Sequence, residues 1–217
     1  MKTTSLLLAA GESERMGFPK ALLRWGGRPL LSHQLSALQR SRIDECIVVL
    51  GREADRLRGM VRPILRPHGW KAHAVINPRP SDGKASSVQA GLAALSRPPD
   101  AILIAAVDQP LETRLVDALL ETAEKEWIMP RDGVWPARRI VVPTFDGKRG
   151  HPTLFHGSLL SELLGVSEAT EGLRRVVRRI PERVLEMPWP RSGILLNLNA
   201  PGDLEALREG DSSSLPA

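Results

Sequence analysis

Short apolar runs alternate along the chain with longer stretches in which hydrophobic residues recur at helical spacing. The runs are continuously apolar, which is typical of strands covered on both faces of a parallel sheet. The expected strands span residues 4–9, 46–50, 73–76 and 101–107. The amphipathic stretches predict helices over residues 29–38, 52–61, 86–95 and 113–127. This alternation predicts a mostly parallel sheet with right-handed crossovers.

The second half of the chain is less regular, because proline and arginine become frequent after about residue 134. Residues 140–144 form another strand-like run, in which Pro143 favours a sheet edge or the end of the strand. Shorter elements are expected at residues 158–164, 172–178, 184–187 and 201–208. We interpret the whole as a single α/β domain over residues 1–209, with a three-layer α/β/α, Rossmann-like architecture. A disordered tail is expected at residues 210–217.

The composition is that of a globular protein, since the 217 residues are 42% hydrophobic and 25% charged. The single cysteine, Cys46, excludes a disulfide framework and a cysteine-based zinc site. No apolar run approaches the roughly 20 residues of a membrane helix. The apolar start leads into a polar loop, as expected for a first strand rather than a signal peptide. We therefore expect a cytoplasmic enzyme.

Basic residues outnumber acidic ones by 30 to 25, which gives a net charge of +5 and an isoelectric point of about 10.0. Arginine supplies 24 of the basic side chains, and its planar fork suits phosphate and carboxylate groups. Nucleic acid is one possible partner, but the arginines are scattered and aromatic residues make up only 4% of the chain. A small polyanionic substrate, or simply an arginine-rich proteome, explains the surplus equally well.

The first segment with chemistry, LLLAAGESERMGFPKALL, follows the opening strand at residues 6–23. Ligands of open α/β sheets bind beyond the carboxyl ends of strands, and a glycine-containing turn there exposes backbone N–H groups to phosphate oxygens. Arg15 and Lys20 add two positive charges to this loop. The segment is neither a dinucleotide fingerprint nor a Walker A loop. An ordinary βα turn explains the glycines, but it does not explain two cations so close together.

A second segment, Val107-Asp108-Gln109-Pro110, closes the most apolar strand. A carboxylate at this end of a strand, facing a phosphate-binding loop, is well placed to hold Mg²⁺. The alternative is a turn that Asp108 starts and Pro110 ends.

Three further segments carry polar side chains. Ser86 and Ser87 begin a helix, where they either cap it or leave N–H groups free for a ligand. Residues 145–154, FDGKRGHPTL, form a basic turn. Asn197 and Asn199 project from one face of an extended segment before Pro201.

Taken together, these segments resemble a known family. Residues 6–23 are similar to the LAxGxSxRMGxxKxLL signature of the MobA-like nucleotidyltransferases, the molybdenum-cofactor guanylyl- and cytidylyltransferases and their relatives. The Ala-Ala-Gly form at residues 9–11 and the RGHP element at residues 149–152 resemble the cytidylyl branch. Two positions depart from the pattern: Val107 replaces a small residue, and Asn199 stands where the cytidylyl branch has aspartate.

The resemblance implies a nucleotide-diphospho-sugar-transferase-like fold and a set of site residues. It places the nucleotide on Leu8, Ala9, Ala10, Gly11, Arg15, Lys20, Ser86 and Ser87. It gives Arg15, Lys20 and Asp108 catalytic roles and makes Asp108 and Asn199 the metal ligands. It puts Arg149, Gly150 and His151 on the side of the acceptor.

The expected reaction is Mg²⁺-dependent transfer of CMP from CTP to the phosphate of molybdopterin or its molybdenum form. Guanylyl transfer to the same acceptor, or nucleotidyl transfer to a sugar phosphate or alcohol phosphate, remains open. So does a non-catalytic protein that binds the pterin and delivers it to a molybdoenzyme. The tryptophans, which either pack in the core or stack on a pterin, are Trp25, Trp70, Trp127, Trp135 and Trp189.

Overall fold

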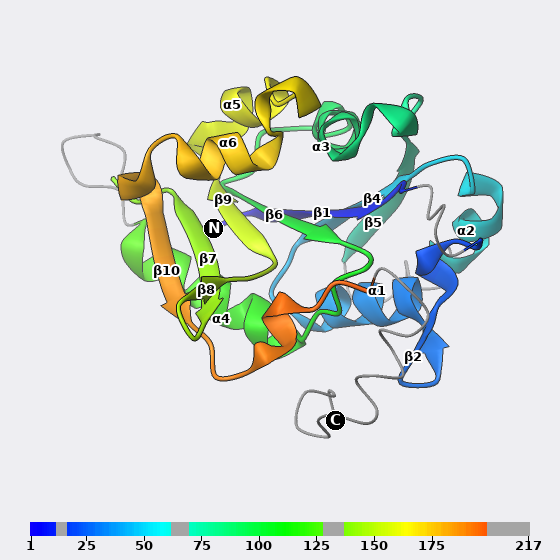
Figure 1. The fold of residues 1–217 in the computed structure, drawn as a ribbon, viewed down its shortest axis with the longest axis horizontal. Coiled ribbons are helices and arrows are strands. Elements are labelled where there is room, and N and C mark those ends of the chain that lie inside the picture. The colour runs from blue at the N-terminus through cyan, green and yellow to red at the C-terminus, as the bar shows by residue number, and fades with distance from the viewer. Residues whose placement is uncertain (12–16, 62–69, 128–136, 199–217) are drawn as a thin grey trace.

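One mixed sheet organises the chain, and helices cover both of its faces (Figure 1). The computed structural model describes residues 1–11, 17–61, 70–127 and 137–198. The sheet has the strand order β10-β7-β9-β6-β1-β4-β5, with β8 paired to β7. Its strands are β1 (Thr3–Ala9), β4 (Glu45–Leu50), β5 (Lys71–Ile76), β6 (Ala101–Ala106), β7 (Ile140–Phe145), β8 (Lys148–Arg149), β9 (Thr153–His156) and β10 (Val184–Pro188).

Most neighbouring strands run parallel, as the alternating pattern predicts. The exceptions are β9, which runs antiparallel to both β6 and β7, and the short β8. A separate small hairpin joins β2 (Arg24–Trp25) to β3 (Arg28–Pro29). The mostly parallel α/β fold is therefore confirmed.

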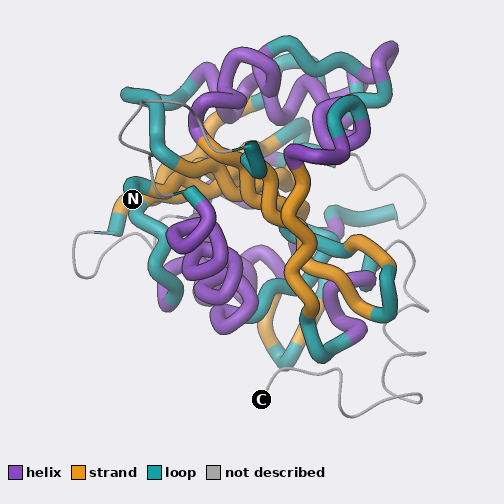
Figure 2. Tube along the Cα trace, turned by 90° about the vertical axis from the view of Figure 1, so that its left-hand side faces the viewer, coloured by secondary structure: helices purple, strands orange, loops and turns teal. Residues whose placement is uncertain are grey.

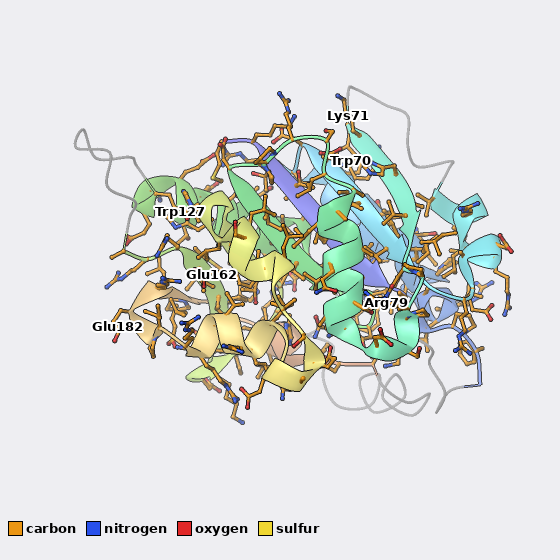
Figure 3. All side chains as sticks on the ribbon, turned by 90° about the horizontal axis from the view of Figure 1, so that it is seen from above. Trp70, Lys71, Arg79, Trp127, Glu162 and Glu182 are labelled. Atoms are coloured by element: carbon orange, nitrogen blue, oxygen red, sulfur yellow. The ribbon has the colours of Figure 1, made fainter. Side chains whose placement is uncertain are left out.

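The helices form two layers, one on each side of the sheet (Figures 1 and 2). One layer holds α1 (Leu30–Arg40), α2 (Ala54–Val61) and α4 (Thr113–Glu126). The other holds α3 (Lys84–Ala93), α5 (Leu160–Leu164) and α6 (Leu173–Arg178). Seen from above, α3 and α5 lie side by side across the sheet (Figure 3). Short 3-10 turns occur at Lys20–Leu22, Pro80–Asp82, Gly157–Leu159, Glu168–Thr170, Pro181–Arg183 and Ser192–Leu195.

Each face of the sheet has its own hydrophobic core. Along β1, Leu7 and Ala9 pack with α1 and α4, whereas Leu6 and Leu8 pack with α3 and α5. This follows from the two-residue period of a strand, which sends successive side chains to opposite faces. Because both faces are covered, β1 is buried throughout, and its sequence is continuously apolar at its centre.

The strand that contains Pro143 is not at the edge of the sheet, because β7 lies between β10 and β9. The alternative expectation, that Pro143 lies near the end of its strand, is correct. Pairing of β7 with β9 stops at Val141. The N and carbonyl of Pro143 point to the side of β7 on which β9 lies, and there the carbonyl accepts a hydrogen bond from Gly150 N. The missing N–H of Pro143 therefore interrupts no pair with β9.

The domain prediction extends over residues that the structure does not describe. The element expected at residues 201–208 and the tail at residues 210–217 lie outside the described ranges. Within those ranges, no helix has both the length and the apolar character that crossing a membrane requires.

Candidate active site

A cleft of about 690 Å³ opens at the carboxyl ends of β1, β4 and β6. After β1 the chain crosses to β4 on one side, while β6 lies on the other, so the cleft sits where the strand order reverses. Open α/β sheets bind ligands at such points. The lining residues are Leu8–Gly11, Pro19–Ala21, Gly51–Glu53, Leu57, Pro80, Ser81, Gly83, Lys84, Ser87 and Ala106–Asp108.

Lys20 and Asp108 meet in this cleft, 88 residues apart in the sequence. Lys20 Nζ lies 3.1 Å from Asp108 Oδ2, and the two side chains are only 19% and 20% exposed. The other carboxylate oxygen, Asp108 Oδ1, is buried and has no hydrogen-bond partner among the residues that the structure describes. A buried anionic oxygen without a partner is costly, so this atom is suited to a ligand that supplies positive charge.

The donor set fits Mg²⁺ rather than a metal held entirely by protein. Among the residues that the structure describes, no three His, Cys, Asp or Glu side chains gather into a metal site. Mg²⁺ commonly binds one or two carboxylates together with substrate phosphates and water. Asp108 Oδ1 provides such a carboxylate. Asn199, the second expected ligand, lies outside the described residues, as does Arg15.

The backbone after β1 forms one wall of the cleft, with Leu8, Ala9, Ala10 and Gly11 all among the lining residues. Gly51, at the end of β4, packs directly against this segment. A Cβ atom on Gly51 would lie 2.4 Å from Ala10 O. The close approach of the two loops therefore requires glycine at position 51, a requirement that the sequence analysis did not anticipate.

The start of α3 forms the opposite wall, and here the two predicted serines differ. Ser87 lines the cleft, but Ser86 does not. Ser86 Oγ donates toward the carbonyls of Arg79 and Gly83, each 2.8 Å away. Ser86 therefore holds the preceding turn, which lies near Arg79 (Figure 3).

The serines do not cap α3, because a carboxylate from another segment does. Ala85 N donates to Glu168 Oε1 at 2.7 Å. Both serine hydroxyls instead accept hydrogen bonds from Asn77 Nδ2, at 2.8 Å for Ser86 and 3.1 Å for Ser87. The capping interpretation of the serines is therefore wrong.

The segment that contains Asn197 lies beside the Asp108 turn, so two of the motifs are brought together. Leu198 N donates to Asp108 O at 2.9 Å. Gln109 Nε2 donates to Asn197 Oδ1 at 2.7 Å. Asn197 thus lies beside the turn that carries Asp108, whereas the residue predicted to lie near the metal, Asn199, is outside the described residues.

The expected acceptor residues lie outside the lining of the cleft. The guanidinium of Arg149 pairs with Glu186, with Nε 2.8 Å from Oε1. Gly150 packs so closely on the neighbouring chain that a Cβ would lie 2.5 Å from Ile194 O. His151 N donates to the same carbonyl at 2.9 Å.

His151 is nevertheless close enough to the cleft to interact with its charges. His151 is an exposed residue, yet loss of hydration is the main cause that lowers the pKa of His151 from 6.5 to about 4. The positive charges of Lys84 and Arg174 lower the pKa further, and Asp108 opposes them. His151 is therefore neutral near pH 7 and can donate a hydrogen bond without adding charge.

The tryptophans belong to the core rather than to the cleft. Trp25 and Trp127 are 2% and 7% exposed, and Trp70 and Trp189 pack against the same core. None of these four lines the cleft, and Trp135 lies outside the described residues. Stacking of these four described rings on a ligand in the cleft finds no support.

A family model described as the MobA-like NTP transferase domain matches residues 5–184. The chain belongs to this family. The match covers β1, both walls of the cleft and Asp108. The family places the chain among the nucleotidyltransferases that use an NTP as donor.

Three proteins illustrate what this chain is similar to. Nicotine blue oxidoreductase of Paenarthrobacter nicotinovorans is 31% identical over 82% of both chains. Molybdenum cofactor guanylyltransferase of Xanthomonas euvesicatoria pv. vesicatoria is 43% identical, over 34% of this chain and 39% of its own length. A Mycobacterium tuberculosis protein in complex with manganese has a TM-score of 0.67 at 22% identity, covering 97% of this chain and 100% of that one. The last likeness concerns the fold alone.

Proposed function

We propose that this protein transfers CMP from CTP to the phosphate of molybdopterin or its molybdenum form, with Mg²⁺ as cofactor. The observation that carries the proposal is the carboxylate of Asp108. It faces Lys20 inside a cleft at the strand ends and keeps one buried oxygen without a partner. The family supports NTP as the donor.

The first wall of the cleft binds the triphosphate. The backbone of residues 8–11 turns at the end of β1, and its N–H groups are suited to phosphate oxygens. The ammonium group of Lys20 neutralises negative charge next to Asp108. Arg15 adds a second cation from the same loop.

Asp108 Oδ1 would hold the metal. Mg²⁺ bound there would supply positive charge that stabilises negative charge at the α-phosphate. Asn199 would be the second ligand, as the resemblance implies.

The acceptor phosphate is already a nucleophile near pH 7, so the protein does not need a general base. One of its oxygens forms a bond to the α-phosphorus, the bond from that phosphorus to the bridging oxygen breaks, and pyrophosphate leaves with the electron pair. The protein contributes by positioning the two substrates and by stabilising the developing charge. Neutral His151, which is close enough to the cleft to interact with Asp108, would orient the acceptor. Arg149 would contribute only after exchanging its ion pair with Glu186 for one with the acceptor phosphate, and Gly150 would contribute by its close packing, which sets the position of His151.

The choice of CTP rests on the Ala-Ala-Gly form of residues 9–11 and on the RGHP element at residues 149–152. The partial match to a guanylyltransferase makes GTP the necessary competitor in any assay. The deciding experiment incubates the protein with Mg²⁺ and either CTP, GTP or ATP, with molybdopterin, its molybdenum form or a sugar 1-phosphate as acceptor. Release of pyrophosphate is the readout.

Pyrophosphate release with CTP and a pterin acceptor would support the proposal. Release with GTP, or with a sugar phosphate alone, would replace the substrate assignment. Tight pterin binding without pyrophosphate release under any condition would indicate a protein that delivers the cofactor to a molybdoenzyme. A thermal-shift titration with each nucleotide runs in parallel, because a ligand that binds only the native state raises the Tm.

A relative that matches over 82% of both chains suggests a second candidate, because its name is that of an oxidoreductase. Such an activity would need an external electron carrier. The only cysteine, Cys46, is buried and its burial raises the thiol pKa to about 12, so no thiolate is present near neutral pH. Oxidation of a nicotinamide cofactor with a quinoid dye as acceptor tests this candidate. Turnover there with no pyrophosphate release in the first assay would favour it.

A further inference from the structure

A polar side chain interrupts the apolar face of α1. Gln34 is 0% exposed and lies among Leu30, Leu31, Leu35 and Leu38, which are equally buried. A buried amide is unfavourable unless its donors and acceptor are all paired. Gln34 is therefore a residue whose hydrogen bonds need an explanation.

The side-chain amide of Gln34 bonds to the main chain of residues 106–111, the segment that carries Asp108. Gln34 Nε2 donates toward three carbonyls, those of Ala106 at 3.3 Å, Val107 at 3.1 Å and Gln109 at 2.6 Å. Gln34 Oε1 accepts from Leu111 N at 3.0 Å. One amide thus holds the main chain on both sides of Asp108.

The chemistry of the partners determines the orientation of this amide. If the amide were reversed, Oε1 would face three carbonyl oxygens and the NH₂ group would face the N–H of Leu111. Both contacts would be repulsive, so the assigned orientation is the one that pairs every group.

The turn needs support of this kind because the sheet ends just before it. The strand β6 ends at Ala106, and beyond it the main chain keeps a bond to β1, from Val107 N to Leu8 O, and one to the segment after β10, from Leu198 N to Asp108 O. The Asp108 side chain forms an ion pair with Lys20. The direction of its carboxylate therefore depends largely on the main chain, and Gln34 is the side chain that bonds to this main chain on both sides of Asp108.

We propose that Gln34 is a positioning residue that aims the Asp108 carboxylate at the divalent metal. This rests on the proposed function, since it takes Asp108 as a metal ligand. Gln34 touches neither metal nor substrate and acts only through the turn. Groups that orient metal ligands from behind often change metal affinity about 10- to 100-fold when they are removed.

The alternative is that Gln34 contributes only to stability. The two roles differ in what they predict for metal binding. A purely structural residue lowers the Tm and leaves the affinity of the folded protein for metal unchanged. A positioning residue changes that affinity and kcat even at temperatures where the variant is fully folded.

The test compares four variants of the full chain. Gln34→Met removes every hydrogen bond of the side chain at similar length. Gln34→Glu keeps an acceptor for Leu111 and loses the amide donors. Asp108→Asn shows how much Mn²⁺ affinity is lost when the proposed metal ligand itself is changed. Leu38→Val, one helical turn away in the same core, is the control for loss of stability alone.

Binding of Mn²⁺ is measured by electron paramagnetic resonance in the presence of CTP, and kcat and KM are measured with Mg²⁺. We expect Gln34→Met and Gln34→Glu to weaken Mn²⁺ binding about tenfold or more and to lower kcat, with the KM for CTP changed less than kcat. Leu38→Val lowers the Tm but leaves the Mn²⁺ affinity unchanged.

Each outcome decides a different point. If Asp108→Asn weakens Mn²⁺ binding and folded Gln34 variants do not, the role of Gln34 is overturned while the metal site stands. If Asp108→Asn has no effect on Mn²⁺ binding, Asp108 is not a metal ligand, and the positioning role of Gln34 is overturned as well. Should neither Gln34 variant fold, hydrogen exchange of the wild-type protein decides, because rapid exchange of the Leu111 amide would show that Gln34 does not hold the turn.

Discussion

Two buried amide side chains, Gln34 and Asn77, form hydrogen bonds that hold two different parts of the cleft. Gln34 holds the Asp108 turn, and Asn77 holds the loop before α3. Both are almost completely buried, at 0% and 3% exposed. They differ in the sequence distance of their partners, which is 72 to 77 residues for Gln34 and 2 to 10 residues for Asn77.

This difference separates a loop closed by local side-chain hydrogen bonds from a turn held by the tertiary fold, although the start of α3 beside that loop is itself capped by Glu168 from a distant segment. Asn77 closes a short loop, accepting from Arg79 N and donating to two serines a few residues on. Such a loop can form as soon as its own residues come together. The Asp108 turn acquires its shape only after α1 has docked on the sheet, because Gln34 comes from that helix. We therefore expect changes on the Asp108 side to affect chemistry and changes on the α3 side to affect stability and binding.

The largest expected effect belongs to Asp108. Asp108→Asn removes the negative charge that would hold the metal, and we expect kcat to fall about 10²- to 10³-fold with the fold retained. The measurement is pyrophosphate release at saturating CTP, with circular dichroism to check the fold. Asp117→Asn, on α4 outside the cleft lining, is the matched control and should leave kcat unchanged. An Asp108→Asn enzyme with wild-type turnover would contradict the metal role.

A smaller effect is expected from the two lysines, one on each wall. Lys20 is mostly buried beside Asp108, whereas Lys84 is exposed, so water screens its charge more strongly. Lys20→Ala should weaken CTP binding about 10- to 100-fold, as expected for a lost charged hydrogen bond. Lys84→Ala should weaken it less. Isothermal titration with CTP and Mg²⁺ compares the two, and an equal loss would remove the distinction between the walls.

The hydrogen bonds of Asn77 should appear as stability rather than as chemistry. Asn77→Leu deprives Ser87 of a donor and the Arg79 N–H of its acceptor, so we expect the free energy of unfolding to fall by about 1–3 kcal/mol. Urea denaturation measures this. Mn²⁺ affinity should stay at the wild-type value, in contrast to the Gln34 variants. A parallel loss of Mn²⁺ affinity would show that the two walls are not independent.

The smallest effect concerns pH. The pKa of His151 is about 4 in the folded protein, below its usual value of 6.5, so the unfolded chain takes up the proton first as the pH falls. Stability from this residue is complete above pH 6.5, declines as the pH falls towards about 4, and then levels off. Urea denaturation measures the free energy of unfolding across this pH range. This free energy should depend less steeply on pH in His151→Gln than in the wild-type protein. Some slope remains, because burial also lowers the pKa values of His33 and His156. An unchanged slope would contradict the lowered pKa.

Much of the sheet was predictable from local patterns. The runs at residues 4–9, 46–50 and 101–107 are continuously apolar, and each is a buried strand in the structure. The convergence of Lys20 and Asp108 was also predictable, because parallel strands place their carboxyl ends at one edge. In both cases a general rule of parallel sheets connects the sequence to the position.

The errors and omissions arose where contacts depend on packing between distant segments. Capping of α3 by Ser86 and Ser87 seemed adequate locally, but Glu168 reaches the helix start from 83 residues away. Gly51 is required by Ala10, a residue just past the end of another strand. The sequence does show Gln34 as a polar residue at an apolar position of an amphipathic helix. This pattern does not identify the groups to which Gln34 forms hydrogen bonds.

The amino-acid sequence by itself determined the parallel α/β architecture, the loop after the first strand and the carboxylate at the end of β6. These depend on periodicity and on the backbone preferences of neighbouring residues, which act over a few positions. Only the tertiary structure decided that one oxygen of Asp108 is buried without a partner and that a glutamine from α1 fixes the turn around it. Hydrogen bonds between groups more than 70 residues apart exist only once both cores have packed, so no local pattern encodes them.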